Sequence, residues 1–216
     1  MAVFAALGAS AQLNESFADG DFTNNPAWTG NTDAWTIVAN SDVAAGATGS
    51  NTLRLNAGPG TSGVRYLSTQ VLGTWGTQQT WGFWMGRREA ATDPNRSYVW
   101  LYANEANVNS STVDGYRIRL GQNGSFDHIM LELVTDGAAT TILESTTGIP
   151  NGLTDFGVLV RVTRSSTGLW SLFTSTLPVA NGSGAIATDL PNATNANVAQ
   201  GTVTDNTITN FDNGYI

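Results

Sequence analysis

The sequence predicts an all-β chain folded as an antiparallel β-sandwich or barrel. Short runs of alternating apolar and polar residues recur along the chain, bounded by Gly, Asn, Asp and Pro. No window shows apolar residues recurring at helical spacing. A length of 216 residues suits one large all-β domain. We therefore assign 12–216 to a single domain of this kind.

The predicted strands are the alternating runs, taken in chain order. They lie at 34–39, 52–56, 64–69, 78–87, 97–103, 115–121, 128–135, 139–144, 157–164 and 168–175, with two more near 201–204 and 207–216. Asp136-Gly137 and Ser166-Thr167-Gly168 join neighbouring runs, and Gly supplies the positive φ that tight hairpin turns require. The stretch 180–200, rich in Asn, Thr, Ala and Gly, is expected to be a long loop.

Two-residue alternation assigns the side chains of 115–121 to two faces. Tyr116, Ile118 and Leu120 form an apolar set that we expect to point into the core. Arg117 and Arg119 must then point outward. The same pattern directs the three valines of 157–164 inward.

The run 97–103 is apolar on both faces, so alternation leaves two assignments open. In one, its three aromatic residues face outward, and in the other they are buried. We adopt the first, which groups these aromatic residues with the outward arginines. If the strands are neighbours in one sheet, its outer face carries Tyr98, Trp100, Tyr102, Arg117, Arg119, His128, Glu132 and Arg161.

This set predicts a site for a neutral or acidic glycan. Flat aromatic rings stack on the apolar faces of sugar rings, and Arg, Glu and His side chains form hydrogen bonds to hydroxyl groups. The alternative is a ladder of cross-strand Arg–Glu and aromatic pairs, each worth about 0.2–1 kcal/mol of sheet stability.

The composition argues against several classes of function. Nine basic residues, all of them Arg, stand against seventeen acidic ones, and the net charge is -8. That balance disfavours partners such as nucleic acid or an anionic membrane surface. The absence of Cys excludes thiol catalysis and Cys-ligated metals, and His128 is the only histidine. The carboxyl groups of Glu132 and Asp136 lack the spacing of the catalytic pair in jelly-roll glucanases. We therefore expect no enzymatic activity.

Three carboxylates flank a glycine turn near the N-terminus: Glu15, Asp19 and Asp21. Hard oxygen ligands at such spacing can hold a structural Ca²⁺ ion, although Asp-Gly-Asp also occurs in plain turns. No other cofactor is expected.

The start of the sequence predicts that the protein is exported, and its end predicts that the chain belongs to a longer polypeptide. The apolar run 2–11 ends in Ala9-Ser10-Ala11, which suggests that 1–11 is a partial signal peptide; an apolar first strand is the alternative. No other stretch approaches the ~20 apolar residues of a membrane span. A strand pattern resumes at 213–216, which suggests a fragment of a longer protein.

The run from Phe17 to Gly30 resembles the opening of a concanavalin A-like, or laminin G-like, jelly-roll domain. Such domains occur at the N-terminus of secreted and cell-surface proteins of Bacteroidota-type bacteria. Further matches lie at 66–69, 81–85, 98–102 and 114–121, and the resemblance covers roughly 15–216. It implies a two-sheet antiparallel β-sandwich of the jelly-roll type over 12–216 that lacks its last strand. It also implies a non-catalytic role compatible with glycan binding, and further domains of the same polypeptide. Family members continue into a last strand with paired acidic residues, so a family calcium site would lack those ligands here.

The leading hypothesis is a carbohydrate-binding or adhesive module of a secreted or cell-surface protein. The alternative is a structural spacer that binds no glycan. A third is an accessory part of a glycoside hydrolase.

Overall fold

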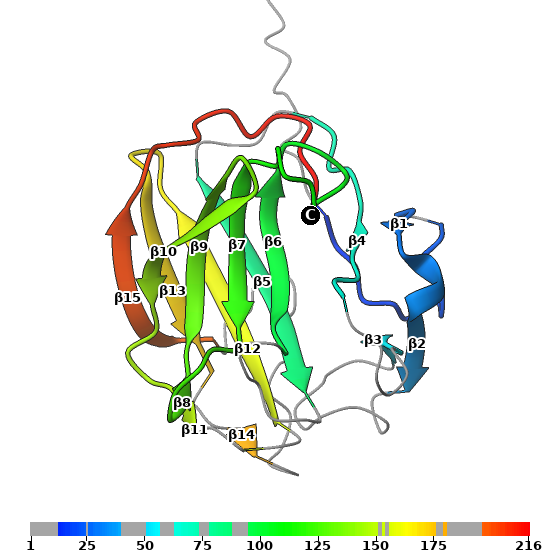
Figure 1. Ribbon diagram of the computed structural model, residues 1–216, viewed down its shortest axis with the longest axis horizontal. Helices are drawn as coiled ribbons and strands as arrows, with labels where there is room; N and C mark the ends of the chain where they lie inside the picture. The colour runs from blue at the N-terminus through cyan, green and yellow to red at the C-terminus, as the bar shows by residue number, and fades with distance from the viewer. Residues whose placement is uncertain are drawn as a thin grey trace, which may run out of the picture.

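The chain is built almost entirely of β-strands (Figure 1). The computed structural model describes residues 13–24, 26–39, 51–56, 63–73, 78–87, 95–150, 153, 156–175, 179–180 and 196–216. Within these ranges the only helical element is the 3-10 turn η1 (Thr32–Ala34), and no helix is long and apolar enough to cross a membrane. The strand pairings there are antiparallel, so the predicted all-β sandwich is confirmed.

Two antiparallel sheets form the body of the molecule. The first sheet has the strand order β10-β9-β7-β6. Its strands are β6 (Ser97–Ala103), β7 (Gly115–Leu120), β9 (Ile129–Thr135) and β10 (Ala138–Glu144). The second sheet has the order β5-β12-β13-β15, with β14 beside the start of β12. Its strands are β5 (Gln79–Arg87), β12 (Phe156–Arg164), β13 (Leu169–Thr174), β14 (Val179–Ala180) and β15 (Val198–Thr204).

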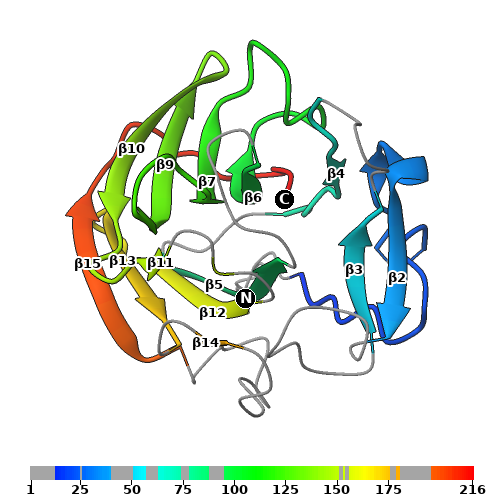
Figure 2. The ribbon, with the colours of Figure 1, turned by 60° about the horizontal axis from the view of Figure 1, so that its bottom comes forward.

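Three two-stranded sheets complete the described structure. They pair β1 (Thr29–Gly30) with β4 (Leu67–Ser68), β2 (Trp35–Ala39) with β3 (Asn51–Leu55), and β8 (Phe126–Asp127) with β11 (Ile149–Pro150). The β2–β3 pair lies at the opposite side of the molecule from β10 and β15, which run side by side (Figures 1 and 2).

Most of the predicted strands are present, with two corrections. The run 64–69 contributes only the short β4. The predicted strand at 207–216 is wrong, because this segment is irregular and only Tyr215 forms bridges, to Gln70 and Ala103. Asn213 has a positive φ of 53°, which interrupts an extended backbone there. The predicted signal peptide at 1–11 and most of the predicted loop at 180–200 lie outside the described residues.

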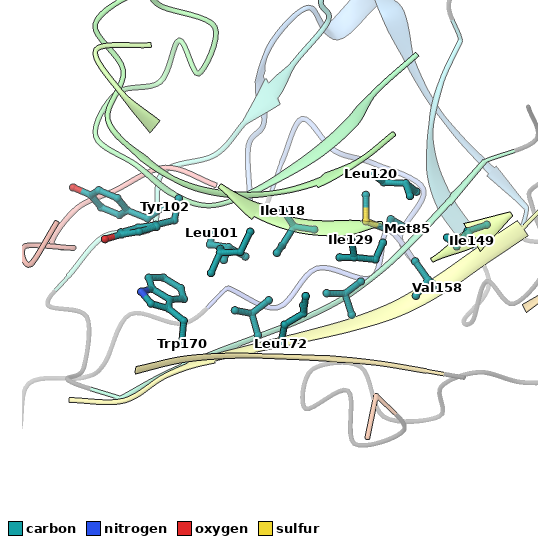
Figure 3. Packing of buried hydrophobic residues seen from close by; sticks show 14 of the residues in the cluster. Met85, Leu101, Tyr102, Ile118, Leu120, Ile129, Ile149, Val158, Trp170 and Leu172 are labelled. Carbon is teal, nitrogen blue, oxygen red and sulfur yellow. The ribbon is translucent and has the colours of Figure 1, made fainter. Parts of the chain in front are cut away.

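The core lies between the two sheets, and alternation predicted its members on the regular strands. Tyr116, Ile118 and Leu120 of β7 are fully buried there. Figure 3 shows Ile118 and Leu120 between the sheets. The inward valines of β12 lie opposite them, as predicted. Trp170 of β13 stacks on Trp81 at 5.5 Å and contacts the Tyr116 ring at 4.5 Å. Complete burial of one large apolar side chain contributes roughly 1.5–3 kcal/mol, so this layer holds the sheets together.

The predicted β9–β10 hairpin is confirmed. Asp136 and Gly137 have φ values of 48° and 69°, which match the left-handed turn that Asp-Gly favours. The turn brings Thr135 opposite Ala138 and so fixes the register of both strands. On its other side β9 pairs with β7, and that pairing sets Glu132 opposite Arg117, where the candidate site lies.

Candidate functional site

The centre of the outer face of the first sheet holds a compact charged cluster. Glu132 of β9 lies directly opposite Arg117 of β7 in the strand register. Arg117 Nε donates to Glu132 Oε2 at 2.7 Å, and Arg119 Nη1 lies 2.7 Å from Glu132 Oε1. One carboxylate therefore pairs with two guanidinium groups. We call Tyr98, Trp100, Arg117, Arg119 and Glu132 the outer-face cluster.

The carboxylate of the cluster is buried, whereas the guanidinium groups reach the surface. The Glu132 side chain is 1% exposed, against 16% for Arg117 and 17% for Arg119. A buried carboxylate requires close cationic partners, and Glu132 has two. Glu132 itself is therefore inaccessible to a ligand. The three charges sum to one net positive charge.

Two aromatic rings lie beside Arg117. Its Cζ atom is 4.0 Å from the centroid of the Tyr98 ring and 5.3 Å from that of the Trp100 ring, both within cation–π range. Trp100 lies on the predicted face but is only 7% exposed. Its ring packs in a small apolar cluster with Ala103, Val108, Val113 and Val134. The indole therefore offers no open face to a sugar.

The predicted outward placement of Tyr102 is wrong. Trp100 pairs with Arg117, but Tyr102 pairs with Tyr116, so Leu101 is the extra residue of a β-bulge. After the bulge the alternation shifts, and both Leu101 and Tyr102 point between the sheets toward Trp170 (Figure 3). The Tyr102 ring packs at 4.9 Å from Phe211. It is part of the core.

Arg161 lies on the other sheet, so the predicted single face of eight residues is wrong. Arg161 belongs to β12 in the second sheet, where its Nε donates to the Ala196 carbonyl at 3.1 Å. Its Cζ atom lies 4.1 Å from the Phe173 ring centroid. His128 precedes β9, and its Nδ1 lies 2.7 Å from the Ser145 carbonyl and 3.6 Å from a Glu144 carboxylate oxygen.

Two residues of this face were not among the predicted site residues. Arg96 Nη1 lies 3.5 Å from the Tyr98 hydroxyl, which adds a third guanidinium beside the cluster. The second residue is Met130, whose Sδ atom accepts a hydrogen bond from Arg119 Nη2 at 2.7 Å. Arg96 precedes Tyr98 by two residues, so the alternation that placed Tyr98 outward also contained the signal for Arg96.

Each of the three N-terminal carboxylates accepts a hydrogen bond from the backbone amide two residues further along the chain. Glu15 Oε1 accepts from the Phe17 amide at 2.6 Å, and Asp19 Oδ1 accepts from the Asp21 amide at 3.1 Å. Hydrogen bonds from the backbone and side chain of Thr23, and then from Asn24, lower the pKa of Asp21 to about 2. Among the residues that the structure describes, no group of three or more His, Asp or Glu side chains is placed to hold a metal ion. Calcium binding at this turn stays a prediction.

Comparisons with known proteins do not place the chain in a family. No family model matches it, and no curated protein shows significant similarity to it. The likeness to concanavalin A-like domains therefore stays a prediction, and the site must be interpreted from its own geometry.

Proposed function

We propose that the chain is a non-catalytic binding module that holds an acidic glycan against the outer-face cluster. The observation that carries the proposal is that Arg117 and Arg119 share one buried carboxylate. The cluster keeps a positive charge at a surface of a chain whose net charge is -8. A ligand with carboxylate or sulfate groups complements that local charge.

Arg117 retains hydrogen-bond donors for such a ligand. It commits Nε to Glu132, while its two Nη groups have no hydrogen-bond partner among the described residues. A guanidinium group binds a carboxylate or sulfate through two parallel hydrogen bonds. Arg96 Nη1 lies 3.5 Å from the Tyr98 hydroxyl and places a further guanidinium group near the start of β6.

The burial of the aromatic rings favours an acidic ligand over a neutral one at this face. Trp100 is covered, and Arg117 already occupies one face of the Tyr98 ring. Stacking of an uncharged sugar therefore has little open aromatic surface to use. The burial of Glu132 supports a non-catalytic role, because a catalytic carboxylate must reach its substrate.

Binding to charged polysaccharides tests the proposal. The purified chain is titrated by calorimetry with alginate, which carries only carboxylates, with carrageenan, which carries only sulfates, and with uncharged dextran. We expect binding to at least one acidic polymer, weakened by added salt because the contact is electrostatic. Arg117→Gln should weaken it about tenfold or more, the loss expected for a charge-assisted hydrogen bond of about 1.5–3 kcal/mol.

Arg65→Gln is the matched control. Among the described residues, Arg65 Nη1 donates a hydrogen bond only to the neighbouring Val64 carbonyl, at 3.1 Å, so this change removes one charge away from the cluster. Arg119 still pairs with Glu132 in Arg117→Gln, so the buried carboxylate keeps a partner. Equal affinities of the two variants, or no acidic polymer bound by the unaltered chain, would contradict the proposal and favour a structural spacer.

A further inference from the structure

The outer face of the second sheet carries a row of hydroxyl groups. Thr80 of β5 lies opposite Thr163 of β12. Thr163 lies opposite Ser171 of β13, and Ser171 lies opposite Thr202 of β15. Directly opposite residues point to the same face, and neighbouring strands lie about 4.8 Å apart. Since the adjacent Val162 points into the core, these four residues form a straight row on the outer face, which we call the hydroxyl row.

The hydroxyl row is free to bind a ligand. In the part of the chain that the structure describes, none of its four hydroxyl groups has a hydrogen-bond partner. Thr80 and Thr202 are exposed, and Thr163 and Ser171 are half-buried. Each hydroxyl can therefore both donate and accept a hydrogen bond.

A hollow of about 280 Å³ lies over three members of the row. Its lining includes Thr80, Thr163 and Ser171 together with Gln78, Ser165 and Leu169. The volume is close to the lower end of the roughly 300–1,000 Å³ range of small-ligand sites. Leu169 is 40% exposed and adds an apolar surface beside the hydroxyl and amide groups.

The hollow is electrically neutral where a ligand would contact it. Of the described residues that line it, only Arg164 is charged. The guanidinium of Arg164 is directed to the interior, where its Cζ lies 4.8 Å from the Phe211 ring centroid and its Nη2 donates to Asn206 Oδ1 at 3.1 Å. A charged ligand would therefore find no counter-ion in the hollow.

We propose that the hydroxyl row and its hollow bind a neutral polysaccharide. Sugar hydroxyls donate and accept hydrogen bonds as Ser and Thr hydroxyls do, and their C–H faces contact an apolar side chain such as Leu169. Hydroxyls on opposite sides of a pyranose ring are separated by about the spacing of neighbouring strands. The hollow is open to solvent, so a polymer chain can lie across the strands. This site is on a different sheet from the outer-face cluster and does not rest on its proposed function.

The test is affinity electrophoresis of the whole chain in gels that contain laminarin, dextran, xylan or galactomannan. We expect retardation by at least one of these neutral polymers. The variant Thr163→Val/Ser171→Ala should weaken the binding about tenfold, the effect of removing two neutral hydrogen bonds. Valine favours the strand, so the variant should retain the thermal midpoint of the unaltered chain. Thr140→Val, at an exposed position of β10 in the first sheet, is the matched control and should bind normally.

The outcomes separate this site from the outer-face cluster. Binding of neutral polymers that is lost in Thr163→Val/Ser171→Ala but kept in Arg117→Gln supports the hydroxyl row. Two results overturn it: no retardation by any of the four neutral polymers, or equal retardation of the double variant and the unaltered chain. Neither result depends on whether alginate or carrageenan binds at Arg117.

Discussion

The outer faces of the two sheets share one pleated geometry but differ in what they leave unpaired. On the first sheet, Arg117 and Arg119 are paired with Glu132 across the strands. On the second, Thr163 and Ser171 lie opposite each other with no hydrogen bond between their side chains. The difference shows that an outward strand position offers a ligand only the groups that its cross-strand neighbours leave free.

Arg161 lies between these two cases. It is on the second sheet, one outward position along β12 from Thr163, and it stacks on Phe173 without a carboxylate partner. Its Nε donates a hydrogen bond to the Ala196 carbonyl, so Ala196 lies over this part of the face. The second face is therefore covered at Arg161 and open at Thr163. Substitutions at Glu132, Arg161 and Thr163 should therefore change the free energy of unfolding by different amounts.

The largest effect is expected at Glu132. Glu132→Ala removes the only carboxylate within ion-pair distance of Arg117 and Arg119 among the described residues. It leaves two partly buried guanidinium groups adjacent and uncompensated, so we expect a loss of about 3 kcal/mol in the free energy of unfolding. Urea denaturation measures this loss.

Glu144→Ala is the control for that prediction. Glu144 is 48% exposed, and among the described residues its carboxylate has one ion-pair neighbour, His128, at 3.6 Å. Its removal should change the free energy of unfolding by no more than about 1 kcal/mol. Similar losses for the two variants would mean that the outer-face cluster contributes no more than an ordinary surface pair.

A smaller effect is expected at Arg161. Arg161→Met keeps much of the side-chain volume over Phe173 but removes the cation–π contact and the donor to Ala196. We expect a loss of about 1–2 kcal/mol, because the Ala196 carbonyl is left without this partner. The same urea series measures it. A loss as large as that of Glu132→Ala would contradict the ranking of the two faces.

Alternation in the sequence predicts well which side chains point inward or outward where a strand is regular. It predicts them poorly where a strand contains a β-bulge. Alternation placed Tyr116, Ile118 and Leu120 correctly, because β7 keeps one register with both of its neighbours. It failed at Tyr102 because a bulge adds one residue at Leu101. Both residues are apolar, so the pattern of 97–103 contains no sign of the extra residue.

The candidate site also depended on information that alternation does not hold. A period of two gives the face of a strand, but not the sheet to which the strand belongs, so Arg161 was grouped with arginines of the other sheet. The burial of Glu132 depends on a register that sets it beside two arginines. The hydroxyl row was missed for the same reason, because its members come from four separate strands.

The smallest effect is expected at Thr163, and it tests whether the hydroxyl row is free. Thr163→Val should change the free energy of unfolding by no more than about 0.5 kcal/mol in urea, because the Thr163 hydroxyl has no hydrogen bond to lose among the described residues. Thr174→Val makes the same change on β13, where the fully buried Thr174 Oγ1 accepts from Gln200 Nε2 at 2.8 Å. That variant leaves a buried donor unpaired, so it should lose about 1–3 kcal/mol. Equal losses at the two positions would mean that Thr163 has a structural partner, and the hydroxyl row would then not be free to bind a ligand.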